Sequence, residues 1–310
     1  MTLFNLYAHI LVCPSDRSSL VEVGSEGQLG CPVCSTVFPV EGGVVRLLPS
    51  EQLGAEGLRQ QAAWDDQADD YDTWNQGYAD RVEVAPTVTP LAGCAGPVLD
   101  LGAGTGRMTE RLARLTGQPT LALDYSLASL QRLVRRCEGL PVVAVQADAR
   151  TLPLADNTIH GAVAAGLVPV LRVEDRRLLL KELARVLRSG APLSISTLNY
   201  NLMYRLWRWR GNAGAKEGEH LHGESYYVRM TPDEFRAELE DDFQVESIRG
   251  IRNIPGRTLD SALAKVPGVG KVKPLASPMT NYGYRLDLAL GATPLSRGTG
   301  FLLLAQVRKR

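Results

Sequence analysis

Between residues 98 and 197 the chain alternates short apolar runs with longer segments whose apolar residues recur at helical spacing. A short continuous apolar run predicts a buried strand, and apolar residues at i, i+3 and i+4 predict an amphipathic helix. The expected strands are residues 98–101, 121–124, 142–149, 159–165 and 193–197, and the expected helices are residues 108–115, 127–137 and 176–188. Because strands that alternate with helices form parallel sheets with right-handed crossovers, we expect an α/β fold.

A glycine-rich turn follows the first of these strands. Residues 98–107 read VLDLGAGTGR, which is an apolar strand, a turn and the start of a helix. This layout lets a ligand lie against bare backbone at the carboxyl edge of a sheet. Glycine is needed there because a Cβ would collide with the ligand and because some turn residues need φ > 0. A dinucleotide fingerprint would need a third glycine at position 107, which is arginine.

The G-x-G-x-G turn, with Asp100 two residues before its first glycine, resembles the first motif of the class I S-adenosylmethionine-dependent methyltransferases. The resemblance implies a Rossmann-like methyltransferase sheet, mostly parallel with an antiparallel last strand, and S-adenosylmethionine as cofactor. In that family the acid at the position of Asp100 helps to hold the methionine ammonium. The turn gives room to the amino-acid end of the cofactor, and its residues here are Gly102, Ala103, Gly104 and Gly106.

Two further acids end the following strands. Asp124 lies about 20 residues after the glycines, where a carboxylate can accept both ribose hydroxyls, and Tyr125 could cover a face of the adenine. The pair Asp148-Ala149 resembles the family's position for the adenine amino group. A doubly wound domain that binds a different nucleotide is the alternative interpretation.

Two knuckles near the amino terminus, residues 13–16 and 31–34, read CPSD and CPVC. Two C-x-x-C turns at such a spacing are typical of a zinc ribbon, in which each knuckle offers two ligands to one tetrahedral ion. The candidate ligands are Cys13, Asp16, Cys31 and Cys34, with Asp16 in the place of a fourth thiolate. Such a zinc would be structural, because no position is open to water. The alternative is a ribbon held by its own small core without metal.

Residues 10–49 resemble a small β-rich zinc-ribbon module that is fused in front of methyltransferase domains or serves as a separate methyltransferase-activating subunit. A helix with Tyr71 on its apolar face is expected after it, within residues 60–74. Many class I enzymes have a similar helix over the cofactor, so Tyr71 is a candidate cofactor contact, with simple packing as the alternative. We therefore expect a module at 1–50, a helical linker or lid at 51–95, and a methyltransferase domain at 96–310.

Two segments of the methyltransferase domain, near residues 200–230 and 252–298, are expected to form a cap insertion, followed by a last strand at 301–307. Residues 199–210 combine large apolar groups with three arginines, which would suit an amphipathic cap helix, a flat acceptor, bases or a membrane surface. His222 lies in a polar loop and is a candidate base for a hydroxyl acceptor, although a loop histidine is also often merely solvated.

Composition narrows the class of protein. A hydrophobic content of 45% and a charged content of 22% are those of a globular protein. No apolar run reaches the ~18 residues of a membrane span, and the start of the chain lacks the basic region and cleavage site of a signal peptide. Five cysteines, an odd number, do not suggest a disulfide framework. We therefore expect a cytoplasmic protein.

The charge is uneven along the chain, and it bears on the acceptor. Residues 1–80 hold 3 Lys+Arg against 12 Asp+Glu, and residues 81–310 hold 31 against 22. An acidic amino-terminal unit is not attracted to nucleic-acid phosphate. The strand at 159–165 is followed by no motif of the N-P-P-Y type, which also disfavours amino methylation of bases or proteins.

Three functions follow from these observations. The first is methyl transfer to a small-molecule acceptor at oxygen, nitrogen or carbon, with peripheral membrane contact as an additional possibility. The second is methylation of a ribosomal RNA base, because the knuckles together with this core resemble the bacterial 23S rRNA guanine-N1 enzymes. The third is a non-catalytic cofactor-binding scaffold whose ribbon binds a partner.

Overall fold

The computed structural model describes residues 7, 9–24, 27–48, 58–59, 61–66, 80–207, 216–219, 226–253 and 278–310. Its strands are β1 (Val21–Val23), β2 (Gln28–Gly30), β3 (Val37–Phe38), β4 (Val40–Glu41), β5 (Val44–Arg46), β6 (Val98–Leu101), β7 (Thr120–Asp124), β8 (Val142–Gln146), β9 (Gly161–Ala164), β10 (Pro192–Asn199), β11 (Glu217–Glu219), β12 (Tyr226–Met230), β13 (Phe243–Ile251) and β14 (Leu302–Lys309).

The helices are α3 (Ala85–Val88), α4 (Arg107–Thr116), α5 (Leu127–Arg136), α6 (Val173–Val186), α7 (Leu202–Trp207), α8 (Pro232–Leu239), α10 (Pro278–Gly291) and α11 (Ser296–Thr299), with short turns η2 (Asp80–Val84), η3 (Thr89–Leu91) and η4 (Val168–Val170). Among the described residues, no helix is both long enough and apolar enough to cross a membrane.

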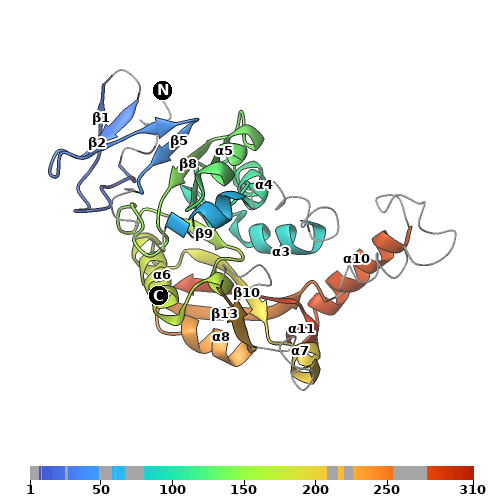
Figure 1. Ribbon diagram of the computed structural model, residues 1–310. Helices are drawn as coiled ribbons and strands as arrows, with labels where there is room; N and C mark the ends of the chain where they lie inside the picture. Colours follow the sequence, from blue (N-terminus) through green and yellow to red (C-terminus); the bar gives the residue numbers. More distant parts are fainter. Residues whose placement is uncertain are drawn as a thin grey trace.

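One large twisted sheet organises the molecule (Figure 1). Strands β10, β9, β6, β7 and β8 lie side by side and parallel in that order. Beyond β10, β14 is antiparallel and pairs in turn with β13. The expected Rossmann-like sheet with an antiparallel last strand is therefore confirmed, and the strand order reverses between β6 and β9, next to the glycine turn.

Helices cover both faces of this sheet. The face that carries Val98, Val163 and Ala122 packs against α3, α4 and α5. The opposite face, with Leu99 and Leu121 among its fully buried residues, packs against α6 and α8. These short strands are buried on both faces, which is why they are apolar throughout rather than alternating.

The amino-terminal segment is built onto the same core. Strands β1, β2 and β3 form a separate small antiparallel sheet, but β5 pairs in parallel with β8 and extends the main sheet at its edge. Tyr7, Ile10 and Leu11 belong to the buried cluster under the main sheet. The Tyr7 hydroxyl donates to the Pro141 carbonyl at 3.1 Å, and the Ala155 N–H donates to the Ile10 carbonyl at 2.8 Å. Figure 1 shows this segment at one end of the molecule, far from α7 and α8.

The hairpin of β11 and β12 covers part of the carboxyl edge. One side of β10 pairs along its length with β14, while its other side pairs with β9 up to Ile195 and with β12 from Leu198. Strand β12 therefore lies beyond the carboxyl end of β9, where it contacts η4. This hairpin falls within the first expected cap segment, and the division into module, linker and methyltransferase domain remains a prediction.

Candidate functional site

The glycine turn between β6 and α4 adopts left-handed backbone at all three glycines. The φ angles of Gly102, Gly104 and Gly106 are 73°, 51° and 88°. A Cβ on Gly106 would lie 2.7 Å from the Leu133 Cγ, so this position requires glycine for packing as well as for its φ angle. These φ angles let the chain turn sharply between β6 and α4 at the carboxyl edge of the sheet.

Asp124, the last residue of β7, holds this turn in place. Its Oδ2 accepts a hydrogen bond from the Gly104 N–H at 2.7 Å, and its Oδ1 accepts one from the Ser126 N–H at 2.9 Å. Burial raises the pKa of this carboxyl, and these hydrogen bonds act in the opposite direction. Each oxygen has a second lone pair, so the carboxylate can accept further hydroxyl donors.

Asp100 lies one strand away and is almost fully buried. The Thr109 hydroxyl, on α4, donates to its Oδ2 at 2.6 Å. Burial raises the pKa of this carboxyl to about 7, against the effect of the Thr109 hydrogen bond and with a smaller contribution from the charge of Asp124. A buried acid with such a pKa would be ionised by a cationic group placed beside it.

Tyr125, Asp148 and Ala149 lie next to one another at the ends of β7 and β8. The Tyr125 ring is half-buried, and its hydroxyl is buried without a hydrogen-bond partner. Burial raises the pKa of this phenol, and the charge of Asp148 adds to the effect. The predicted cofactor residues of these two strands therefore converge on one edge of the sheet.

Two contacts in this region are not evident from the sequence motifs. Arg150 pairs with Asp148 at 2.6 Å and with Asp175, in the first turn of α6, at 3.2 Å. Asp65, within helical residues 61–66, accepts hydrogen bonds from the Ser126 hydroxyl at 2.5 Å and the Ala128 N–H at 3.1 Å. The expected helix before the core thus contacts the start of α5 through an acid. Tyr71 and His222 lie outside the described residues.

The two amino-terminal knuckles come together into one cluster. One ligand atom from each of Cys13, Asp16, Cys31 and Cys34 lies within 4.8 Å of the other three. The Cys13 and Cys34 sulfurs are 3.6 Å apart, and the Cys31 sulfur lies 3.3 Å from the Asp16 Oδ2.

Backbone geometry around this cluster suits thiolate ligands. The Cys31 sulfur accepts hydrogen bonds from the Val33 and Cys34 N–H groups at 3.4 and 3.2 Å. Several hydrogen bonds together lower the pKa of the Cys31 thiol. Burial is the largest single influence on this pKa, but it acts in the opposite direction and does not outweigh them. Arg17 and Ser35 have positive φ angles of 63° and 61°, one residue after each knuckle, so the two turns have the same shape. The donor set fits a tetrahedral zinc ion with no open position.

The comparisons with known proteins agree with this geometry. Residues 98–190 match the family model described as a methyltransferase domain. A demethylmenaquinone methyltransferase of Corynebacterium urealyticum is 36% identical over 124 residues, which are 40% of this chain and 47% of the relative. The chain spans about half the length of the curated relatives that it matches.

Solved methyltransferases share the fold over most of the chain. The geranyl diphosphate C-methyltransferase of Streptomyces coelicolor has a TM-score of 0.56 at 15% identity, covering 84% of this chain and 100% of that one. The 1,6-didemethyltoxoflavin-N1-methyltransferase of Burkholderia thailandensis has a TM-score of 0.53 at 14% identity, covering 94% and 99%. The chain therefore has the Rossmann-like fold that these methyltransferases share, and residues 98–190 are the part that matches the methyltransferase-domain model.

Proposed function

We propose that this protein binds S-adenosylmethionine at the carboxyl edge of β6, β7 and β8 and transfers its methyl group to a small-molecule acceptor. The observation that carries the proposal is the left-handed glycine turn fastened by Asp124. The matched methyltransferase domain and its curated relatives support the same reaction class. The solved neighbours from Streptomyces and Burkholderia hold S-adenosylhomocysteine, which supports the choice of cofactor.

Different residues at the sheet edge would bind different parts of this cofactor. The glycine turn from Gly102 to Gly106 would give room to the amino-acid end, and Asp100, with its raised pKa, would supply negative charge for the methionine ammonium. Asp124 uses its remaining lone pairs for the ribose hydroxyls. Tyr125, Asp148 and Ala149 would hold the adenine, and the ion pair with Arg150 keeps the Asp148 carboxylate in one orientation.

The bound cofactor supplies a methyl group on a sulfonium that is already reactive, so the protein contributes mainly position and exclusion of water. The hairpin of β11 and β12 lies over the end of β9 and supplies a wall on the acceptor side. Oxygen, nitrogen and carbon can all act as the nucleophile in such a displacement, and an acceptor that starts as a neutral O–H, N–H or C–H group must also release its proton to water or to a base. His222 stays a candidate base for a hydroxyl acceptor.

The names of the relatives and neighbours favour small acceptors. They include a demethylmenaquinone methyltransferase, an O-methyltransferase of Aspergillus sclerotiorum and the geranyl diphosphate enzyme. The knuckle cluster favours a second candidate, an RNA base methyltransferase, because such a module is expected in front of that class of core. A structural zinc ion held by Cys13, Asp16, Cys31 and Cys34 belongs to either proposal.

Isothermal titration with S-adenosylhomocysteine tests cofactor binding, with Asp124→Ala as the variant and the same change at the exposed Asp241, Asp241→Ala, as the matched control. Transfer of a labelled methyl group into fractionated cell extract then identifies the chemical class of the acceptor. Label in small molecules supports the proposal, and label in RNA supports the second candidate. Cofactor binding without transfer to any fraction would favour a scaffold, and absence of binding would overturn the proposal.

A further inference from the structure

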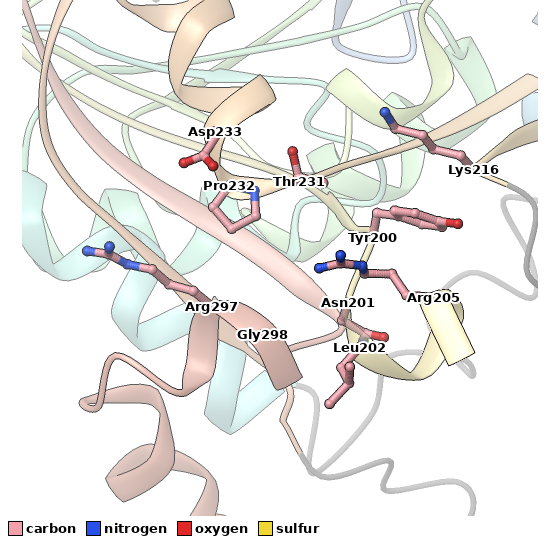
Figure 2. A pocket seen from close by; sticks show the side chains of 10 residues that line it. All are labelled: Tyr200, Asn201, Leu202, Arg205, Lys216, Thr231, Pro232, Asp233, Arg297 and Gly298. Atoms are coloured by element: carbon pink, nitrogen blue, oxygen red, sulfur yellow. The ribbon is translucent and has the colours of Figure 1, made fainter. Parts of the chain in front are cut away.

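A cavity of about 890 Å³ lies at the carboxyl end of β10, and Figure 2 shows the side chains that line it. Its cations do not converge on one point. The Arg297 Nε donates to the Ile248 carbonyl at 2.9 Å, and Figure 2 shows this side chain pointing away from Arg205. Lys216 is paired with Glu234. The cavity therefore offers no pair of cations to a single anion.

The amino terminus of α5, in contrast, takes a hydrogen-bond acceptor from a distant part of the chain. The first N–H groups of an α-helix have no partner inside the helix. In α5 the N-cap Ser126 serves one of them, because its hydroxyl accepts from the Ser129 N–H at 3.1 Å. The Ala128 N–H donates instead to the Asp65 Oδ1 at 3.1 Å, across 63 positions of the chain. The first turn of α5 holds no acid of its own, so Asp65 supplies the negative charge that a helix amino terminus favours.

Asp65 also orients the hydroxyl of Ser126. The same Oδ1 that accepts the Ala128 N–H accepts the Ser126 Oγ at 2.5 Å. Ser126 is only 1% exposed, so its hydroxyl depends on protein partners. A hydroxyl has one proton and two lone pairs. Donation to Asp65 therefore leaves the lone pairs of Ser126 for the Ser129 N–H, and Asp65 sets the N-cap geometry of α5.

Ser126 connects Asp65 to the acid that is proposed to bind the ribose. The Ser126 N–H donates to the Asp124 Oδ1 at 2.9 Å, and the Asp124 Oδ2 accepts the Gly104 N–H at 2.7 Å. A continuous set of hydrogen bonds thus leads from helical residues 61–66 to the glycine turn. Burial is the largest cause of the raised pKa of Asp124, and the charge of Asp65 adds to it, which reflects how near the two acids are.

The residue after Asp65 provides an internal comparison. Asp66 is exposed and makes neither contact with the start of α5. Helical residues 61–66 therefore direct one carboxylate to α5 and leave its neighbour to solvent. The contact with α5 belongs to position 65 and does not follow from an acidic segment as such.

We propose that Asp65 is a positioning residue for the cofactor, which acts through Ser126 to hold Asp124 in the arrangement that binds the ribose. This assignment rests on the proposed function, since it concerns the same site. A group that is fixed before binding loses less entropy when the ligand arrives. Because coupling between two sites is reciprocal, cofactor binding at Asp124 must also strengthen the attachment of helical residues 61–66 to α5.

The first test is isothermal titration of the full chain with S-adenosylhomocysteine. Asp65→Ala removes both hydrogen bonds, and we expect the affinity to fall about five- to tenfold. Asp65→Asn should keep most of the affinity, because a single oxygen accepts both hydrogens and an amide oxygen can replace it. Asp66→Ala makes the same change at the exposed neighbour and should bind as the wild type does.

A double-mutant cycle then asks whether Asp65 acts through Ser126. We expect Asp65→Ala/Ser126→Ala to bind about as weakly as the weaker single variant, because the second change removes a contact that is already lost. Hydrogen exchange gives a separate readout. S-adenosylhomocysteine should slow exchange at the amides of residues 61–66 in the wild type, and should slow it less in Asp65→Ala. A residue that only stabilised the fold would change the melting temperature and leave the affinity unchanged.

A loss of affinity in Asp65→Ala that Asp65→Asn restores, together with a non-additive double variant, supports the assignment. Equal affinity of Asp65→Ala and Asp66→Ala, or losses that multiply in the double variant, overturns the assignment and leaves the proposed function intact. A wild-type chain that fails to bind S-adenosylhomocysteine overturns the proposed function instead.

Discussion

The Asp124 carboxylate accepts the Gly104 N–H at 2.7 Å, so the acid that ends β7 fixes the turn that follows β6. The two residues are 20 positions apart in the chain, and the strands β6 and β7 are neighbours in the sheet. It gives one side chain two tasks, because the same carboxylate is proposed to bind the ribose. Loss of this acid should therefore affect both the shape of the turn and the affinity for the cofactor.

The first prediction concerns Asp124→Asn. Both carboxylate oxygens accept backbone N–H groups, and an amide must turn its NH₂ toward one of them, so one contact is lost. We expect the affinity for S-adenosylhomocysteine to fall about tenfold or more, measured by isothermal titration. Asp241→Asn, on the exposed loop before β13, makes the same chemical change without these contacts and should bind normally. Equal affinity in the two variants would refute this role of Asp124.

The second prediction concerns Gly106→Ala. Alanine at a φ of 88° is strained, and its Cβ would meet Leu133 at 2.7 Å. We expect a loss of about 1–3 kcal/mol in the free energy of unfolding, measured by urea denaturation. Gly93→Ala is the control, since its φ is not positive and no atom lies within 4 Å of the added Cβ. A loss of similar size in both variants would show that position 106 does not require glycine more than position 93 does.

Much of the central sheet could be predicted because the burial of each strand is visible in its own sequence. The predicted strand 98–101 matches β6, and the strand predicted at 121–124 lies within β7. Strands buried on both faces must be apolar throughout, so they stand out in the sequence. The strand expected at 142–149 ends instead at Gln146, because the chain turns at Asp148, whose carboxylate accepts the Arg150 N–H at 2.8 Å.

Long-range pairings could not be predicted. The parallel alignment of β5 with β8 joins residues 44–46 to residues 144–146, and nothing in either segment specifies its partner. The candidate cofactor residues 100, 124 and 148 could be proposed from the sequence because each acid lies within or just after an apolar strand. Arg150 and Asp65 were not, since their contacts depend on where α6 and the helical residues 61–66 lie in space. The cavity at β10 also requires the fold, because its lining comes from four separate segments.

The third prediction concerns the pH dependence of stability through Asp100. Its pKa rises from 3.8 in the unfolded chain to about 7 in the fold, so the folded protein binds this proton more tightly. The carboxyl therefore lowers stability as the pH rises above 3.8, and the full cost is reached above the folded pKa. Asp100→Asn removes this cost while its Oδ1 can still accept the Thr109 hydroxyl.

We expect Asp100→Asn to be more stable than the wild type at pH 8 by roughly 1–3 kcal/mol, and this difference to shrink steadily toward pH 4. Urea denaturation at both pH values measures it. The same variant should bind S-adenosylmethionine more weakly, because the methionine ammonium loses its counter-charge. A variant that is less stable than the wild type at pH 8 would contradict the cause given for the raised pKa.

The fourth prediction concerns zinc at the knuckle cluster. Four ligand atoms within 4.8 Å of one another, two of them on buried cysteines, should retain one zinc per chain through purification. Metal analysis should find that zinc in the wild type and lose it in Cys31→Ser. Cys94→Ser, which changes a cysteine outside the cluster, should keep the full amount.

Asp16→Cys completes the thiolate set and is expected to bind zinc more tightly than the wild type, measured by competition with a chelator. Chelation should lower the melting temperature of the wild type, because the cluster packs on the main core through Cys13 and through the ion pair of Arg17 with Glu182 at 3.0 Å. Cofactor affinity should change little, since the cluster lies outside the glycine turn. A chain free of zinc, with a melting temperature that chelators do not change, would mean that the amino-terminal segment is held by its own apolar core.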